Sequence, residues 1–127
     1  MMRAAALVAV LSGPAVAEPM SADAFDAYVT GKTLSFALPD GTSFGRERYG
    51  PGRSVLWSSA PGLCQTGTWF DSDGMICFVY DTDQDPKCWT VTRTDRGLRA
   101  SSTGGTVLFE TAPAPEPLTC AGPDLLS

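Results

Sequence analysis

The sequence predicts an all-β fold, namely a small antiparallel up-and-down barrel or meander of about eight strands with one short N-terminal helix and disulfide staples. Three observations support this class. Apolar residues recur with a period of two from Thr33 onward, tight turns rich in Gly, Pro and Asp follow at regular spacing, and a single stretch has helical periodicity. An open sheet of eight strands would leave two long unpaired edges, and closure into a barrel removes both. We therefore expect a barrel, with a two-sheet β-sandwich as the alternative.

The helical stretch covers residues 21–30. Ser21 can cap its N-terminus, Asp23 suits the positive first turn, and Phe25, Tyr28 and Val29 fall on one face. Gly31 follows as a C-terminal stop. This pattern predicts a short amphipathic helix that packs over one end of the sheet.

The segments with strand periodicity lie between turns such as Pro39-Asp40-Gly41 and Asp71-Ser72-Asp73-Gly74. In chain order they cover residues 33–38, 42–49, 55–59, 66–70, 75–80, 88–94, 98–102 and 106–111. Residues 18–111 are thus predicted to form a single β-barrel-like domain. Residues 112–127 contain too much proline to extend a ladder, so we expect a C-terminal tail that Cys120 ties down.

The N-terminus has the features of a secretory signal peptide at residues 1–17. Arg3 supplies the positive start, residues 4–11 form a short apolar run, and Ala15-Val16-Ala17 fits a cleavage site before Glu18. The apolar run is far shorter than the roughly 20 residues that span a bilayer, and no later segment predicts a membrane span. Cleavage removes one arginine and no acid, which changes the formal net charge of −5 to −6. The mature protein is expected to be a monomer in the periplasm or secreted.

Composition excludes several classes of function. An acidic chain argues against nucleic acid, because binding to phosphates requires clustered Lys and Arg. The chain has no histidine, so neither a Ser-His-Asp or Cys-His arrangement nor an imidazole metal site can be built. Most acids lie in turns, where local backbone hydrogen bonding accounts for them. We therefore expect no catalytic residues, no cofactor and no enzymatic activity.

Four cysteines in a small exported chain predict two disulfides, for which three pairings are possible. The loop between Cys77 and Cys88 is centred between residues 82 and 83, so a symmetric hairpin sets these two cysteines opposite one another. The preceding hairpin places Cys77 opposite about residue 68 rather than Cys64. We favour Cys77–Cys88, which leaves Cys64 for Cys120, and each bond could contribute about 2–4 kcal/mol. A metal or catalytic thiol site is disfavoured without histidine or a C-x-x-C spacing.

Two charged constellations are candidate sites. The alternating acids Asp81, Asp83 and Asp85 resemble the opening of a calcium loop, although Pro86 and Thr92 stand where an EF-hand needs Gly and Glu, so a solvated turn is favoured. The second group is cationic: Arg46 and Arg48 lie on one strand face, with Glu47 on the other face, and Arg53 lies beyond the turn. These arginines could bind an anion or a partner, although an exposed strand with ion pairs is the simpler interpretation.

Aromatic residues crowd the central strands, and four of them, Trp57, Trp69, Tyr80 and Trp89, are candidate ligand contacts. If Trp57, Phe78 and Trp89 point inward, they would largely fill a barrel of this size. Small barrels are usually packed, with room for one small ligand at most. A packed core is therefore favoured over an aromatic-lined pocket.

The segments AFDAYVTGKTLSF and RERYGPGRSVLW, the pattern C-x-x-G-x-W, and the later ICFVY and CW resemble a family of small exported alphaproteobacterial proteins. The likeness covers about residues 24–89, with a weaker echo at PLTCAGPD. It implies export and a shared β-fold, and it implies no activity and no site residues. In size, predicted export and disulfides the chain also resembles small periplasmic barrels that inhibit proteases or lysozyme. The Ser-Gly-x-x-Tyr segment of lysozyme inhibitors is absent from the sequence.

These observations together favour an exported, non-enzymatic binding or scaffold protein of the cell envelope, whose partner is a small molecule or an envelope protein. The alternative is a periplasmic inhibitor of a protease or lysozyme. An inhibitor would need a protruding loop, for which residues 39–41 and 49–52 are the candidates.

Overall fold

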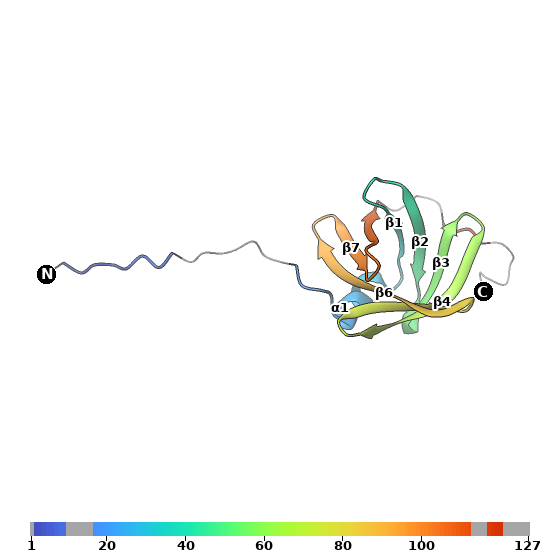
Figure 1. The fold of residues 1–127 in the computed structure, drawn as a ribbon, viewed down its shortest axis with the longest axis horizontal. Helices are drawn as coiled ribbons and strands as arrows, with labels where there is room; N and C mark the ends of the chain where they lie inside the picture. Colours follow the sequence, from blue (N-terminus) through green and yellow to red (C-terminus); the bar gives the residue numbers. More distant parts are fainter. Residues whose placement is uncertain (1, 10–16, 113–116, 121–127) are drawn as a thin grey trace.

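The computed structural model describes residues 2–9, 17–112 and 117–120. In this part of the chain the strands form one closed antiparallel barrel in which each pairs with the next in sequence (Figure 1). They are β1 (Thr33–Ala37), β2 (Ser43–Tyr49), β3 (Ser54–Ala60), β4 (Leu63–Ser72), β5 (Met75–Tyr80), β6 (Asp83–Thr94), β7 (Gly97–Ser102) and β8 (Val107–Thr111). The pairs Ser35↔Thr111 and Ala37↔Phe109 join β1 to β8 and close the barrel. The barrel prediction is confirmed, and the sandwich alternative is wrong.

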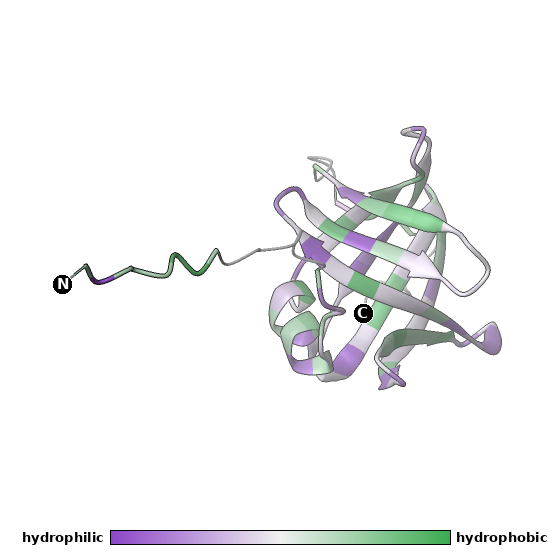
Figure 2. Ribbon diagram, turned by 60° about the vertical axis from the view of Figure 1, so that its left-hand side comes forward, coloured by the Kyte–Doolittle hydropathy of each residue, from purple (hydrophilic) through white to green (hydrophobic). Residues whose placement is uncertain are grey.

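Hydrophobic and hydrophilic residues alternate along several strands (Figure 2), as expected where successive side chains of a pleated strand face the interior and the outer wall in turn. On β1, for example, Leu34 and Phe36 join the interior cluster. This cluster comprises Phe25, Val29, Leu34, Phe36, Tyr49, Val55, Trp69, Ile76, Phe78, Val91, Leu98, Ala100 and Leu108. The apolar period of two in the sequence is thus the period of interior positions.

The helix α1 (Ala22–Val29) closes one end of the barrel. Ser21 caps it by accepting a hydrogen bond from the backbone N–H of Ala24 at 3.1 Å. Phe25 and Val29 are buried, and the ring of Phe25 makes edge contacts with Tyr49 and Trp69. Backbone bonds on either side of the helix anchor it, with Met20 donating to Val91 and Gly31 to Tyr49. The predicted capping helix is confirmed.

The strand β6 begins at Asp83, earlier than the predicted start at residue 88, because the β5–β6 hairpin turns tightly. Tyr80 pairs with Asp83, and the register then shifts so that the next pair is Phe78↔Lys87. Residues 84–86 therefore bulge opposite a single residue of β5. A bulge needs no continuous ladder, which explains how Pro86 is tolerated within a strand.

Both predicted disulfides are present. Cys77 and Cys88 face each other across β5 and β6, as the hairpin symmetry predicts. Cys64, at the start of β4, bonds to Cys120 of the tail. These two bonds indicate an oxidising, non-cytoplasmic environment.

Residues 2–9 run away from the barrel without helix or strand, and their side chains are exposed (Figure 2). Part of the predicted signal peptide, residues 1 and 10–16, lies outside the described residues, as do residues 113–116 and 121–127 of the predicted tail. No helix in the described ranges has the length and apolar character to cross a bilayer.

Candidate functional site

The barrel encloses a cavity of about 440 Å³. Apolar and aromatic side chains line most of it: Phe25, Phe36, Phe44, Tyr49, Trp57, Phe78, Tyr80, Trp89, Val91, Leu98, Ala100 and Leu108. Polar residues Ser59, Gln65, Thr82, Asp83 and Lys87 also border it. These polar residues come from the strand ends remote from α1, whereas Phe25 of α1 lies at the other end. The cavity is thus a cup with a helix as its floor and a polar rim.

A glycine on β2 determines how Trp57 of β3 packs in the cavity wall. A side chain at Gly45 would clash with the indole of Trp57, so the absence of a Cβ allows this ring to lie flat against β2. The register of β2 against β1 shifts beside Gly45, which leaves Phe44 without a partner. This irregularity lets Phe44 reach the cavity, where its ring centroid lies 5.6 Å from that of Trp57 and 6.4 Å from that of Trp89.

A glycine also determines the position of Tyr80 on the opposite side. A Cβ on Gly67 of β4 would meet the ring of Tyr80 and the carbonyl oxygen of Val79. The Tyr80 ring therefore packs over β4 and stacks on Phe78 with a centroid distance of 6.4 Å. Its hydroxyl reaches across the interior to β2.

The target of that hydroxyl is Glu47, the buried carboxyl group of the cavity wall. Only 3% of Glu47 is exposed. Tyr80 donates its hydroxyl to the two carboxylate oxygens, at 3.1 and 3.2 Å. Burial raises the pKa of Glu47 from 4.5 to about 8, and the hydrogen bond from Tyr80 opposes this shift in part. Burial, followed by the charge of Glu47, raises the pKa of the Tyr80 hydroxyl.

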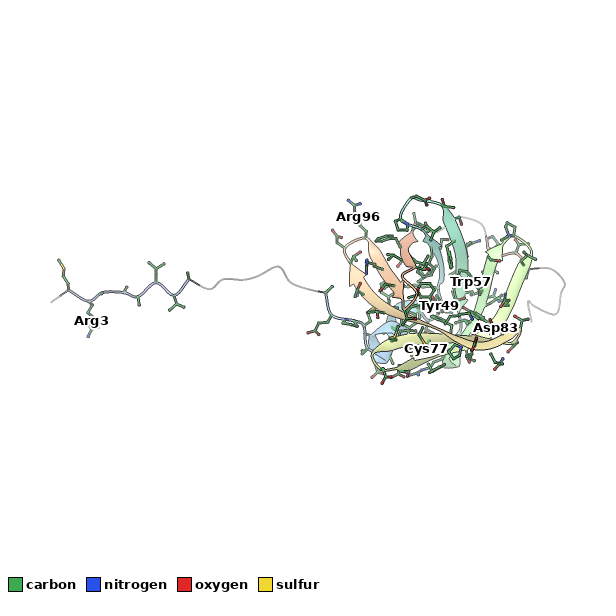
Figure 3. All side chains as sticks on the ribbon, in the orientation of Figure 1. Arg3, Tyr49, Trp57, Cys77, Asp83 and Arg96 are labelled. Carbon is green, nitrogen blue, oxygen red and sulfur yellow. A yellow bond between two sulfur atoms is a disulfide. The ribbon has the colours of Figure 1, made fainter. Side chains whose placement is uncertain are left out.

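Three of the four aromatic candidates, Trp57, Tyr80 and Trp89, line this cavity, and Trp57 and Tyr49 both point into the barrel (Figure 3). The expectation of a packed core is wrong for the half of the barrel near the rim. Aromatic residues do not fill that half because Gly45, Gly67 and Ala100 occupy inward positions. Trp69 instead belongs to the packed half, where only 2% of it is exposed.

The arginine cluster does not form a common site. Arg53 pairs with Asp71 at 3.2 Å and lies 4.4 Å above the ring of Trp69, at the closed end of the barrel. Arg46 and Arg48 lie on β2 at positions that face the outer wall, away from the cavity. The structure thus gives Arg53 a structural role beside Trp69, and none of the three arginines lines the cavity.

The acidic candidates do not converge on a cation site. Within the described residues, no group of three or more acidic or cysteine side chains could hold a metal ion. Asp83 pairs with Lys87 at 2.9 Å, and Asp81 accepts a hydrogen bond from Thr66. Asp85 contributes its backbone N–H to Asp83. The calcium prediction is therefore not supported, and the solvated-turn interpretation fits these contacts.

Glu47 was not among the sequence candidates, although the sequence contained a signal for it. A strand that places Arg46 and Arg48 on the outer wall must turn Glu47 inward, since alternate residues face opposite sides. The inward position of an acid in a small barrel is unusual enough to mark a site.

No protein-family model, curated protein or solved structure matches this chain. The site is therefore interpreted from its geometry and chemistry alone.

Proposed function

We propose that this protein is an exported, non-enzymatic binding protein that holds one small, largely apolar molecule inside the barrel, in the periplasm or outside the cell. The observation that carries the proposal is the aromatic cup with its polar rim. Its volume of about 440 Å³ falls within the range of typical small-molecule sites, roughly 300–1,000 Å³. Eight strands also form the smallest common barrel with space for one ligand.

The positions of two carboxyl groups, those of the buried Glu47 and the half-buried Glu110, support binding rather than catalysis. Glu110 accepts hydrogen bonds from the Tyr28 hydroxyl at 2.7 Å and the Leu98 N–H at 3.0 Å, and so holds α1 and β7 in place. Glu47, in contrast, lines the cavity and is buried. General acid–base chemistry on a bound molecule usually employs two groups in defined positions, whereas a single carboxyl suffices to orient a ligand.

The test is a titration of the full chain, with both disulfides formed, with N-phenyl-1-naphthylamine, a weakly basic apolar dye that fluoresces in apolar surroundings. We expect saturable, one-to-one binding. Ala100→Trp projects a large side chain into the cavity and should weaken the dye affinity by at least about tenfold. Ser101→Trp is the matched control, because Ser101 is the next residue on β7 and faces the outer wall.

Thermal unfolding of both variants verifies that each is folded. Loss of dye affinity in Ala100→Trp but not in Ser101→Trp would support the proposal. Absence of saturable binding to the wild-type protein, or equal binding by both variants, would refute it. In that case an outer surface, and with it the alternative of an inhibitor, would become the better hypothesis.

A further inference from the structure

The position of Glu47 in the cavity wall suggests which chemical class of ligand the cup takes. Glu47 lies in the middle of β2, where its neighbours in register are Leu34 on β1 and Trp57 on β3. Both flanking strands thus offer an apolar side chain to the carboxyl group. A carboxylate has about four acceptor positions, and the Tyr80 hydroxyl uses only part of this capacity.

The charged side chains near the two ends of the barrel have partners other than Glu47. Lys87, which borders the cavity at the rim, pairs with Asp83 at 2.9 Å. Arg93 lies over the ring of Tyr28 at 5.1 Å, at the closed end near Glu110. The titratable or charged groups that line the cavity, besides Glu47, are Tyr49, Tyr80, Asp83 and Lys87. Tyr28, Arg93 and Glu110 lie together at the closed end, outside the cavity lining. The salt bridges of the described residues join Arg53 to Asp71 and Lys87 to Asp83.

The aromatic wall around Glu47 favours positive charge. Ring faces carry partial negative charge and attract cations, and this attraction is stronger when the site excludes water. The ring of Phe44 contacts the rings of Trp57 and Trp89, and Tyr80 approaches Glu47 from β5. The chain also has a formal net charge of −5, which attracts cations at long range.

We infer that the cup binds an organic amine, in which a protonated ammonium group contacts the Glu47 carboxylate and an apolar chain or ring fills the aromatic cavity. This inference rests on the proposed function, since it names the ligand class of the same cavity. An alcohol would gain one hydrogen bond at Glu47 but no charge pairing. A carboxylate ligand would gain no charge pairing at Glu47, and the negative ring faces and the net negative charge of the chain would repel it.

Binding of an amine should displace a proton from Glu47. Burial favours the neutral acid in the empty cavity, and an ammonium group restores the ionised form. The amine enters already protonated, so the proton that leaves comes from the carboxyl group. Close to neutral pH we expect release of about one proton per bound amine.

The experiment uses three probes with the same apolar chain, namely octylamine, octanol and octanoate, to displace N-phenyl-1-naphthylamine from the full chain. We expect octylamine to be at least about tenfold more effective than octanol and octanoate. Glu47→Gln should reduce the ratio of amine to alcohol affinity to about one, because the amide cannot carry the counter-charge. Glu110→Gln is the matched control and should keep the wild-type ratio, since Glu110 bonds to Tyr28 and Leu98 outside the cavity.

Ratios within each variant compare the two ligands on the same protein, so a change in dye affinity does not affect them. Titration calorimetry in buffers of different ionisation enthalpy then measures the proton released. Equal affinities for octylamine and octanol, or tighter binding of octanoate, would overturn the amine inference while the binding function stands. Failure of the dye itself to bind would refute the binding function instead.

Discussion

Glu47→Gln should remove a large pH dependence from the folding stability of the empty protein. The pKa of Glu47 rises from 4.5 in an exposed setting to about 8 in the barrel. Between these pH values the folded state binds more protons than the unfolded state, so the free energy of unfolding falls as pH rises. The contribution is fully present below pH 4.5 and lost above about pH 8.

The magnitude follows from the size of that shift. One pKa unit corresponds to about 1.4 kcal/mol, so ionisation of Glu47 costs up to about 5 kcal/mol of unfolding free energy. Such a loss is a large fraction of the 5–15 kcal/mol, roughly, that stabilises a typical domain. A glutamine stays neutral at every pH in this window and can still accept the Tyr80 hydroxyl.

Urea unfolding followed by tryptophan fluorescence, repeated across this pH window, measures the effect. We expect the unfolding free energy of the wild type to fall towards alkaline pH and that of Glu47→Gln to fall much less. Asp95→Asn, in the exposed β6–β7 turn, is the control and should keep the wild-type profile. Parallel profiles for wild type and Glu47→Gln would refute the assignment of Glu47 as a buried acid.

Three stability predictions concern the scaffold. Cys64–Cys120 spans 56 residues and Cys77–Cys88 spans 11. Replacing the first pair with alanine should therefore cost about 4 kcal/mol and the second about 3 kcal/mol. Equal or reversed losses in urea unfolding would show that loop length does not set the stabilisation. Phe25→Ala should cost about 3–5 kcal/mol in the same assay, because its ring is 2% exposed at the floor of the cup. A loss below about 1 kcal/mol would show that α1 does not anchor the barrel.

Most of the fold could be predicted from local sequence patterns. A closed barrel was predicted from the period of two after Thr33, from the turn residues, and from the two unpaired edges that an open sheet would leave. The capping residue Ser21 correctly marked the start of α1. The pairing of Cys77 with Cys88 followed from hairpin symmetry. The early start of β6 was missed because Pro86 reads as a strand breaker, and only the register shift opposite β5 accommodates it.

The sequence by itself predicted which residues of a regular strand share a face, because alternation along a strand is a local property of the backbone. It did not determine whether those residues fill the barrel. That outcome depends on the register between strands, which sets Trp57 against Gly45 and Tyr80 against Gly67. It depends also on the closure of the barrel, which brings the Tyr80 hydroxyl to Glu47 from a strand far along the chain. A cavity is a property of volumes summed across all strands, so only the tertiary structure could reveal the cup and its buried acid.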